Sequence, residues 1–360
     1  MKFLVITNHS DMFWRFRGDL TAELLKRGEV VVSAPFVGHE DDLKAMGCRC
    51  IDTELDRRSL NIHKEIRLLR FYRKLISEEK PDVVITYSIK PNIYGGLVCR
   101  RLNIPYYANV QGLGSVFQRE SYARGASFLY RLAMKKACAV FFENEANAAV
   151  FLDRNIIPAE KVKVLNGAGV NLNFYAKQPY PPEENGIHFL YLGRIMHEKG
   201  MDEFFEAAVK LKKKYGDRVL LDLVGYFEDD YEEKINELER EHVISFYGFR
   251  SDPRPYYAAS HCVVLPSYHE GMSNVLLEAA ASGRPLIASD IPGCREALTD
   301  NKNGFLIPPR DSEGLYQAME RFLSLSQKER ASMGEFSRQK METEFDKRQV
   351  VRDTLATLQL

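Results

Sequence analysis

The feature that most restricts the fold of this chain is a regular alternation between short apolar runs and longer amphipathic segments. In the first half of the chain the runs are rich in β-branched residues and lie at 2–7, 30–34, 83–87, 106–110, 140–142 and 163–165. Segments with helical periodicity separate them. Strands that alternate with helices form a parallel sheet covered by helices on both faces. The first half is therefore expected to be a doubly wound α/β domain.

A polar, proline-rich stretch around residues 166–186 interrupts the alternation and is typical of a linker. Beyond it the alternation resumes, and from Gln327 onward the pattern is helical only. Strands are expected at 188–192, 219–224, 244–247, 262–266, 285–289 and 304–307, with a helix at 275–282. A chain of 360 residues is long enough for two domains. The expected division is an N-terminal domain at 1–170, a C-terminal domain at 171–340 and a helical tail at 341–360.

Two such domains are expected to face each other across a cleft, because open α/β folds bind ligands at the carboxyl edges of their sheets. The charge is unevenly divided between them. Residues 1–180 contain 27 Lys and Arg against 19 Asp and Glu, and residues 181–360 contain 23 against 31, so the halves carry +8 and −8. The basic half suits an anionic partner, whereas the acidic half argues against a nucleic-acid binder. A chance asymmetry is the alternative.

Other classes of protein are excluded by simpler features. No apolar run approaches the roughly 18–20 residues of a spanning helix, and the opening MKFLVITNHS becomes polar too early for a signal peptide. The six cysteines form no CxxC pair and lie beside no His-rich motif, so neither a disulfide framework nor a zinc site is indicated. The protein is expected to be cytoplasmic.

A first chemical motif, LGRIMHEKG at 192–200, follows the first expected strand of the second domain and leads into a helix. Arg194 and Lys199 lie together on this loop, and Gly193 permits close approach to its backbone. Two cations beside a helix N-terminus suit a diphosphate. A basic loop beside a helix-capping glycine is the simpler alternative.

A second motif, PSYHEGMSNVLLEA at 266–279, again joins a strand to a helix. Glu270 lies on the loop and Glu278 on the helix. A carboxylate accepts two hydrogen bonds at once, so Glu278 suits a ribose diol and Glu270 suits sugar hydroxyls. Backbone N–H groups at the helix start suit phosphate oxygens, and they belong to Gly271, Met272, Ser273, Asn274 and Val275.

Together these motifs resemble the retaining glycosyltransferases of family 4. The sequence GRxxxEKG at 193–200 is followed by EGxxNVLLEA at 270–279, ASGRPLIA at 281–288 and DNKNGFLI at 300–307. The resemblance implies the GT-B fold of two Rossmann-like domains, with a final helix that crosses back to the first domain. It also implies a hexosyltransferase that uses a nucleotide-sugar donor, with UDP favoured by family frequency, and needs no metal or other cofactor.

The same resemblance assigns roles to particular residues. Arg194 and Lys199 are expected to hold the donor diphosphate, Glu270 to contact the transferred sugar and Glu278 to contact the ribose. No paired acidic metal motif is present, because Asp229-Asp230 is typical of an acidic helix start. The charge of the departing nucleotide is therefore assigned to Arg194, Lys199 and the helix start near Asn274, and preorganised donors of this kind contribute about a few kcal/mol each.

Two loops of the first domain narrow the resemblance. YSIKPNIYG at 87–95 and VQGLGSVF at 110–117 resemble the branch that builds capsule, lipopolysaccharide or glycoprotein oligosaccharides on undecaprenyl diphosphate. Gln111 occupies the position where many members have a histidine that touches the donor sugar, so it keeps a hydrogen-bonding group but cannot act as a base. Likewise, many members have a Gly-Gly loop after the first strand, and residues 8–11 (NHSD) take its place in this chain. The expected acceptor or cleft residues are Ser10, Lys90, Asn92, Gln111 and Gly112.

Two basic amphipathic segments suggest a membrane surface as a partner. Basic amphipathic helices lie on anionic membranes at roughly 1 kcal/mol per cation, although each segment suits an ordinary surface helix as well. The second lies at 122–136. The first, at 62–76, contributes the expected membrane-facing residues Lys64, Arg67, Arg70, Arg73 and Lys74.

The expected function is transfer of a sugar from a nucleotide-sugar to a polyprenyl-diphosphate-linked saccharide, at the inner face of a bacterial cytoplasmic membrane. An oxocarbenium-like transition state is expected, as in glycosidases. Two alternatives stay open. One is an enzyme similar to UDP-N-acetylhexosamine 2-epimerase, and the other is a glycosyltransferase with a soluble acceptor, against which the basic first half argues.

Overall fold

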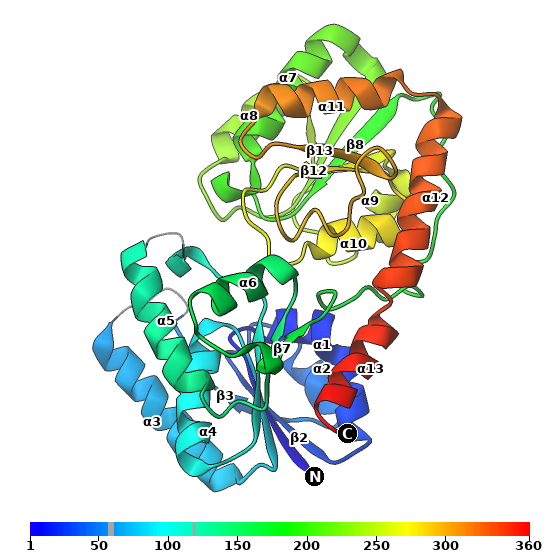
Figure 1. The fold of residues 1–360 in the computed structure, drawn as a ribbon. Coiled ribbons are helices and arrows are strands. Elements are labelled where there is room, and N and C mark those ends of the chain that lie inside the picture. The colour runs from blue at the N-terminus through cyan, green and yellow to red at the C-terminus, as the bar shows by residue number, and fades with distance from the viewer. Residues whose placement is uncertain (57–60, 118–119) are drawn as a thin grey trace. The chain divides into compact units, whose positions relative to one another are not determined.

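The computed structural model describes residues 1–56, 61–117 and 120–360 (Figure 1). The chain divides into two compact units. Unit 1 comprises Met1–Ala168 together with Arg348–Leu360, and unit 2 comprises Gly169–Lys347. The first boundary lies two residues before the expected end of the N-terminal domain, and the segment that rejoins unit 1 begins at Arg348 rather than at residue 341.

Unit 1 contains a parallel sheet in the order β3-β2-β1-β4-β5-β6-β7. Every strand expected in this half is present within one or two residues, whereas β3 was not expected as a strand because its sequence, RCID, is short and half of its residues are charged. The strands are β1 (Lys2–Ile6), β2 (Glu29–Ala34), β3 (Arg49–Asp52), β4 (Val83–Tyr87), β5 (Tyr106–Val110), β6 (Ala139–Phe142) and β7 (Val162–Val164).

Helices cover both faces of this sheet, and alternate residues of β1 show why. Leu4 and Ile6 belong to one buried cluster, while Phe3 and Val5 belong to another, as the two-residue period of a strand requires. The first cluster is completed by α3 (Ile62–Glu79), the π-helical turn η1 (Pro91–Gly95), α4 (Gly96–Leu102), α5 (Glu120–Met134) and α6 (Glu145–Asp153). The second is completed by α1 (Ser10–Leu25), α2 (Glu40–Ala45) and the last helix, α13 (Lys347–Thr357).

Unit 2 repeats this architecture with a parallel sheet in the order β10-β9-β8-β11-β12-β13. Its strands are β8 (Ile187–Leu192), β9 (Val219–Val224), β10 (Ser245–Phe246), β11 (Cys262–Leu265), β12 (Leu286–Ser289) and β13 (Gly304–Ile307). Its helices are α7 (Met201–Tyr215), α8 (Glu232–Arg240), α9 (Arg254–Ala259), α10 (Asn274–Ala281), α11 (Ser312–Ser324) and α12 (Gln327–Glu344). The strand order reverses between β8 and β11, and ligands of open α/β sheets bind at such a point.

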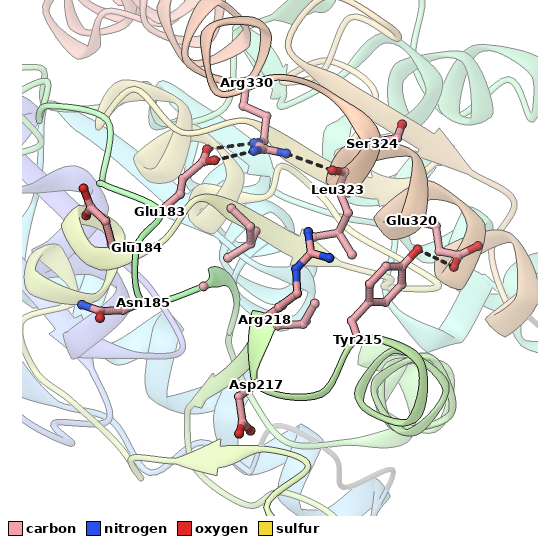
Figure 2. A pocket seen from close by; sticks show the side chains of 13 residues that line it. Glu183, Glu184, Asn185, Tyr215, Asp217, Arg218, Glu320, Leu323, Ser324 and Arg330 are labelled. Carbon is pink, nitrogen blue, oxygen red and sulfur yellow. Dashed lines mark hydrogen bonds and ion pairs between the residues drawn. The ribbon is translucent and has the colours of Figure 1, made fainter.

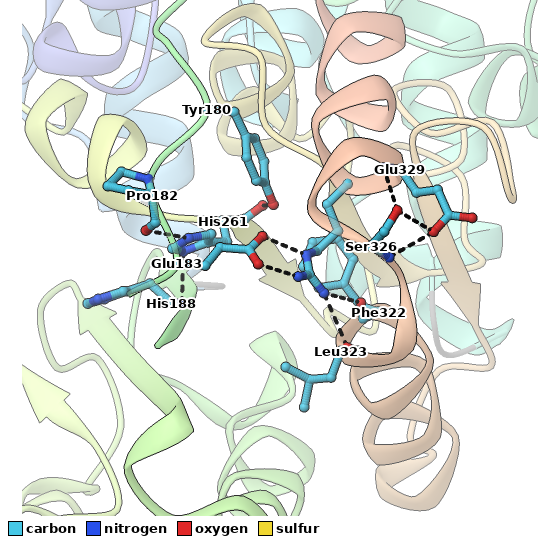
Figure 3. A network of polar contacts seen from close by, with 10 residues as sticks. Tyr180, Pro182, Glu183, His188, His261, Phe322, Leu323, Ser326 and Glu329 are labelled. Carbon is cyan, nitrogen blue, oxygen red and sulfur yellow. Dashed lines mark hydrogen bonds and ion pairs between the residues drawn. The ribbon is translucent and has the colours of Figure 1, made fainter. Parts of the chain in front are cut away.

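A polar network fastens the linker to unit 2 (Figure 3). Arg330 donates to both carboxylate oxygens of Glu183, at 2.6 and 3.0 Å, and also to two carbonyls at the end of α11. His261 is buried; its Nδ1 accepts from the His188 N–H at 3.0 Å and its Nε2 lies 3.2 Å from the Pro182 carbonyl. Burial lowers the pKa of His261 to about 4, so the network holds this imidazole neutral.

Candidate functional site

The two motifs of unit 2 meet at the point where its strand order reverses. Lys199 follows β8 and Glu270 follows β11, and Lys199 Nζ lies 2.5 Å from Glu270 Oε1. Two glycines permit this approach. At Gly200, which has φ of +73°, a Cβ would lie 2.1 Å from the Pro266 carbonyl oxygen, and at Gly293, with φ of +90°, it would lie 2.7 Å from Glu270 Cβ.

Glu270 is held from two sides. Its Oε1 also accepts a hydrogen bond from Ser267 Oγ at 2.9 Å, and its side chain is 12% exposed. The Lys199 side chain is 15% exposed. An ion pair with so little water around it has a fixed geometry, so the pair presents one positive and one negative group at a constant separation.

Arg194 lies on the same loop as Lys199 but has a different partner. The loop after β8 pairs with the loop after β9 through a bridge between Ile195 and Phe227. This pairing places Glu228 Oε2 2.9 Å from Arg194 Nη1, while the Arg194 side chain stays 39% exposed. Sequence reasoning missed Glu228, because it is 34 residues away and no local pattern marks it.

The start of α10 provides the backbone donors of the second motif. Ser273 caps the helix by accepting from the Leu276 N–H, and its own N–H donates to the Gly293 carbonyl at 2.8 Å. The N–H of Ser273 is therefore engaged within unit 2 in this structure, and its expected contact with a phosphate stays a prediction. Asn274 and Val275 open the first helical turn, where N–H groups lack intrahelical acceptors.

Glu278 lies on α10 in a defined orientation. The buried Tyr257 of α9 donates its hydroxyl to Glu278 Oε2 at 2.9 Å. One carboxylate oxygen is thus fixed by a rigid aromatic side chain, a partner that the sequence did not reveal. Of the remaining residues expected to offer backbone N–H groups to phosphate, Gly271 is partly exposed and Met272 is buried.

In unit 1 the structure gives three of the expected residues local structural roles. Ser10 is fully buried, and its Oγ links α1 to the loop after β2 by donating to Gly38 and accepting from Val37. Asn92 is 1% exposed, and its amide bonds Thr86 and the Asn109 carbonyl. Both side chains are occupied by protein partners in this structure, and their expected contact with a ligand stays a prediction.

The third of these residues, Lys90, is neutralised within unit 1. Its Nζ lies 2.5 Å from Glu65 Oε1 on α3 and 2.8 Å from the Asp56 carbonyl. Gln111 and Gly112 differ from it, since they follow β5 and stay partly exposed. Gln111 Oε1 lies 3.3 Å from Ser88 Oγ, which follows the neighbouring strand β4.

The cations of α3 point away from the sheet. The helix buries Leu68, Tyr72, Leu75 and Ile76 on the core of unit 1. Its expected membrane-facing side chains are exposed, and three of them form surface ion pairs, Lys64 with Asp56, Arg67 with Glu54 and Lys74 with Glu78. Exposed pairs of this kind contribute about 0–1 kcal/mol, so the cations remain able to meet another anion.

A cavity of about 630 Å³ opens elsewhere in unit 2, at the amino ends of β8 and β9 (Figure 2). Its lining includes Glu183, Tyr215, Arg218, Glu320 and Arg330, and none of the residues expected at the donor site. Since open α/β sheets bind ligands at the carboxyl ends of their strands, this cavity has no part in the site built above.

Within residues 1–56, 61–117 and 120–360, no cluster of three or more His, Cys, Asp or Glu side chains is arranged to hold a metal ion. In the same residues no helix has the length and apolar character needed to cross a bilayer.

Each unit matches a known family on its own. Residues 175–340 match the family model of the group 1 glycosyl transferases, and residues 4–144 match the glycosyl transferase 4-like model. With two parallel-sheet α/β units, the protein is a glycosyltransferase of the GT-B class. Unit 2 is thus similar to the group 1 glycosyl transferases and unit 1 to the glycosyl transferase 4-like family.

Several relatives share most of this chain. It is 27% identical over 308 residues to the N,N'-diacetylbacillosaminyl-diphospho-undecaprenol α-1,3-N-acetylgalactosaminyltransferase of Campylobacter jejuni, covering 81% of this chain and 80% of the relative. It is 26% identical over 285 residues to the UDP-Gal:α-D-GlcNAc-diphosphoundecaprenol α-1,3-galactosyltransferase of Escherichia coli, covering 73% and 72%.

Solved structures show the same fold at lower identity. The Anabaena protein HepE in complex with UDP matches with a TM-score of 0.81 at 19% identity, over 100% of both chains. The sucrose-phosphate synthase of Thermosynechococcus elongatus matches with a TM-score of 0.77 at 19% identity, over 100% of this chain and 98% of the other.

Proposed function

We propose that this protein transfers a sugar from a UDP-sugar donor to a saccharide linked to a polyprenyl diphosphate, with retention of anomeric configuration and without a metal ion. The observation that carries the proposal is the meeting of the GRxxxEKG and EGxxNVLLEA loops at the strand-order reversal of unit 2. Relatives named for diphospho-undecaprenol substrates support the acceptor class.

The donor site follows from the chemistry of the side chains. Arg194 and Lys199 bind the diphosphate, and the first turn of α10 adds backbone N–H groups. Lys199 already pairs with Glu270 and Arg194 with Glu228. The carboxylates hold the cations in place before the nucleotide binds, which lowers the entropy lost on binding.

Two glutamates bind the ribose and the transferred sugar of the donor. Glu278 accepts from the ribose diol with the carboxylate that Tyr257 orients. Glu270 contacts hydroxyls of the transferred sugar. Its Oε1 already accepts hydrogen bonds from Lys199 and Ser267. In the retaining reaction the acceptor hydroxyl attacks on the face from which the phosphate leaves, and the phosphate takes its proton.

We also propose that unit 1 binds an anionic membrane surface through α3. Arg67, Arg70 and Arg73 recur every three residues and are exposed, and Ile62 and Ile66 beside them are 68% and 41% exposed. Cations with neighbouring exposed apolar side chains are typical of helices that lie on lipid.

A second helix of unit 1 supports the same surface. On α5, Phe128 is 56% exposed and Tyr122 is 49% exposed, although its buried face already packs on the core. Both α3 and α5 pack against α4 and η1. Large exposed apolar residues on two helices that share these neighbours suit insertion among lipid headgroups.

The donor class is tested by thermal unfolding in the presence of UDP-, GDP- and ADP-sugars. A ligand that binds only the folded state raises its apparent stability by RT ln(1 + [L]/Kd), so UDP-sugars are expected to raise the melting temperature and the others to leave it unchanged. Stabilisation by GDP- or ADP-sugars alone would contradict the UDP assignment. Conversion of a UDP-N-acetylhexosamine to its 2-epimer without an acceptor would instead identify an epimerase.

A further inference from the structure

A residue with an unusual backbone conformation lies at the carboxyl edge of the unit 1 sheet. Ser88 directly follows β4, and its φ is +74°. Residues other than glycine rarely adopt this left-handed region, because their Cβ crowds the backbone there. Glycine would form the same turn at no steric cost. Strained residues are concentrated at functional sites, which points to a role for the Ser88 side chain that the turn itself does not need.

The Ser88 hydroxyl joins the ends of three neighbouring strands. Its Oγ donates to Asn8 Oδ1 at 2.8 Å and, over a longer distance of 3.3 Å, to Gln111 Oε1. Asn8 comes two residues after β1 and Gln111 comes directly after β5, and the strands are neighbours in the order β1-β4-β5. The three side chains therefore meet where the strand order of unit 1 reverses, and open α/β sheets bind ligands at such a point.

The bond from Ser88 determines which end of the Asn8 carboxamide is left for a ligand. A carboxamide has an oxygen that accepts and an NH2 group that donates, so a hydrogen bond at one end fixes the orientation of both. Ser88 binds the oxygen of Asn8. Within residues 1–56, 61–117 and 120–360 the Asn8 nitrogen has no hydrogen-bond partner, and the residue is partly exposed. Its N–H groups are therefore available to the oxygen of a ligand.

The character of these side chains indicates the class of ligand. Asn8, Ser88 and Gln111 are all uncharged and partly exposed. Phosphate groups are bound most strongly by cationic side chains, whereas neutral hydroxyls and carboxamides match the hydroxyls of a saccharide, which both donate and accept. This part of the edge therefore suits a sugar ring better than a diphosphate.

We propose that Ser88 is a positioning residue for Asn8, and that the amide nitrogen of Asn8 donates to a hydroxyl of the saccharide substrate. Ser88 holds the Asn8 oxygen, so the carboxamide meets the substrate in one orientation instead of two. Because it needs a sugar substrate, this role rests on the proposed function. The hydroxyl belongs to the transferred sugar or to the acceptor saccharide, and the KM values of the two substrates distinguish these sources.

Substitution of each partner tests the role in the full chain. Ser88→Gly removes the hydroxyl and suits the backbone conformation, whereas Asn8→Asp keeps an oxygen for Ser88 and removes both N–H donors. Each variant is expected to raise the KM of one substrate, the UDP-sugar or the lipid-linked acceptor, roughly tenfold through the loss of one hydrogen-bonded contact. UDP affinity is expected to stay at the parent value. Unchanged KM values for both substrates in either variant would overturn the proposal.

A double-mutant cycle separates positioning from an independent contact. Because Ser88 acts through Asn8, the double variant is expected to be no worse than Asn8→Asp alone, and penalties that multiply would overturn the proposal. The matched control is His242→Gly, which replaces another residue of positive φ, +55°, after α8 in unit 2. Its KM values are expected to equal those of the parent protein. An equal rise in this control would show that the backbone change, and not the hydroxyl, is responsible.

A measurement on the bond itself is independent of turnover. Relaxation of the ¹⁵N signal of the Asn8 side-chain amide is expected to show motion of larger amplitude in Ser88→Gly than in the parent protein, because the carboxamide oxygen is no longer held. Equal motion in the two proteins would overturn the link between the residues. If instead no UDP-sugar binds the parent protein, the proposed function fails, while the relaxation measurement still judges the Ser88–Asn8 bond.

Discussion

At the residue scale, the two cations of the donor loop have different partners but the same expected role. Lys199 pairs with the nearly buried Glu270, whereas Arg194 pairs with Glu228 and is more exposed. Loss of one charge-assisted contact costs about 1.5–3 kcal/mol. We therefore expect Lys199→Ala and Arg194→Ala each to weaken UDP binding about 10- to 150-fold in calorimetry.

The matched control is Lys210→Ala on α7, which removes the same charge from an exposed pair with Glu313. UDP affinity is expected to stay at the parent value in this variant. Unchanged affinity in both Lys199→Ala and Arg194→Ala would contradict the diphosphate assignment.

The two glutamates of the second motif are expected to respond differently to neutral substitution. Glu270→Gln should lower kcat more than it weakens UDP binding, because its carboxylate acts on the sugar as charge develops. Glu278→Gln should mainly raise the KM for the donor, because the ribose contact is the same in the ground and transition states. Steady-state kinetics and UDP calorimetry measure the split, and equal loss of UDP affinity in both variants would show that the roles are not divided.

At the element scale, the exposed face of α3 predicts salt-sensitive binding to lipid. Arg67→Ser, Arg70→Ser and Arg73→Ser together are expected to weaken binding to phosphatidylglycerol vesicles about 150-fold, since three cations contribute about 1 kcal/mol each. The effect should fade with salt, since charges are screened over about 8 Å at physiological ionic strength.

The control for α3 is the same charge change on a unit 2 helix, with serine at Lys210, Lys213 and Lys214 of α7. Co-sedimentation with vesicles is expected to be normal in this control. If the α3 variant sediments as the parent does at every salt concentration, α3 is only a structural helix and α5 becomes the next candidate.

The polar network that fastens the linker to unit 2 predicts that the stability of the protein depends on pH. In the folded state burial lowers the pKa of His261 to about 4, so its imidazole is neutral. In the unfolded chain the pKa returns to its ordinary value of about 6.5. The neutral His261 therefore contributes fully to the free energy of unfolding above pH 6.5. This contribution is lost as the pH falls from 6.5 through about 4, and the total loss is at most about 3 kcal/mol.

Replacing His261 by Gln keeps one acceptor for the His188 N–H and one donor for the Pro182 carbonyl without a titrating ring. Urea unfolding is expected to show a smaller loss of stability between pH 6.5 and 4 in His261→Gln than in the parent. Parallel stability curves for the two proteins would exclude His261 as the source.

The elements also show what the sequence could and could not predict. Hydrophobic alternation located twelve of the strands within one or two residues, and most of these strands are buried on both faces, although β7 and β10 are not. It missed β3, which is short and half-exposed. The motif loops were placed correctly at strand ends because local sequence determines a strand-loop-helix unit.

Contacts between distant segments were beyond the reach of the sequence. Glu228 and Tyr257 meet Arg194 and Glu278 only through the pairing of separate loops and helices. For the same reason the sequence did not reveal that the amide of Asn92, on an expected loop, is hydrogen-bonded to Thr86 of β4 and to the Asn109 carbonyl of β5.

At the scale of the whole molecule, the two units provide different chemistry. Unit 2 has paired cations and helix-start N–H groups at its strand-order reversal, which suit a nucleotide diphosphate. Unit 1 has the exposed cations of α3 and the partly exposed Gln111 at the carboxyl edge of its sheet, which suit a lipid-linked saccharide. The charge imbalance of +8 and −8 between the halves of the sequence follows this division.

The central claim is metal-independent transfer to a lipid-linked acceptor, and one measurement tests it most directly. The protein is incubated in EDTA with a UDP-sugar and a saccharide linked to undecaprenyl diphosphate, and the lipid is analysed by mass spectrometry. We predict that the lipid gains one sugar residue and that free UDP appears only when the acceptor is present. An acceptor of unchanged mass, or a product formed only after Mg²⁺ or Mn²⁺ is restored, would contradict the claim.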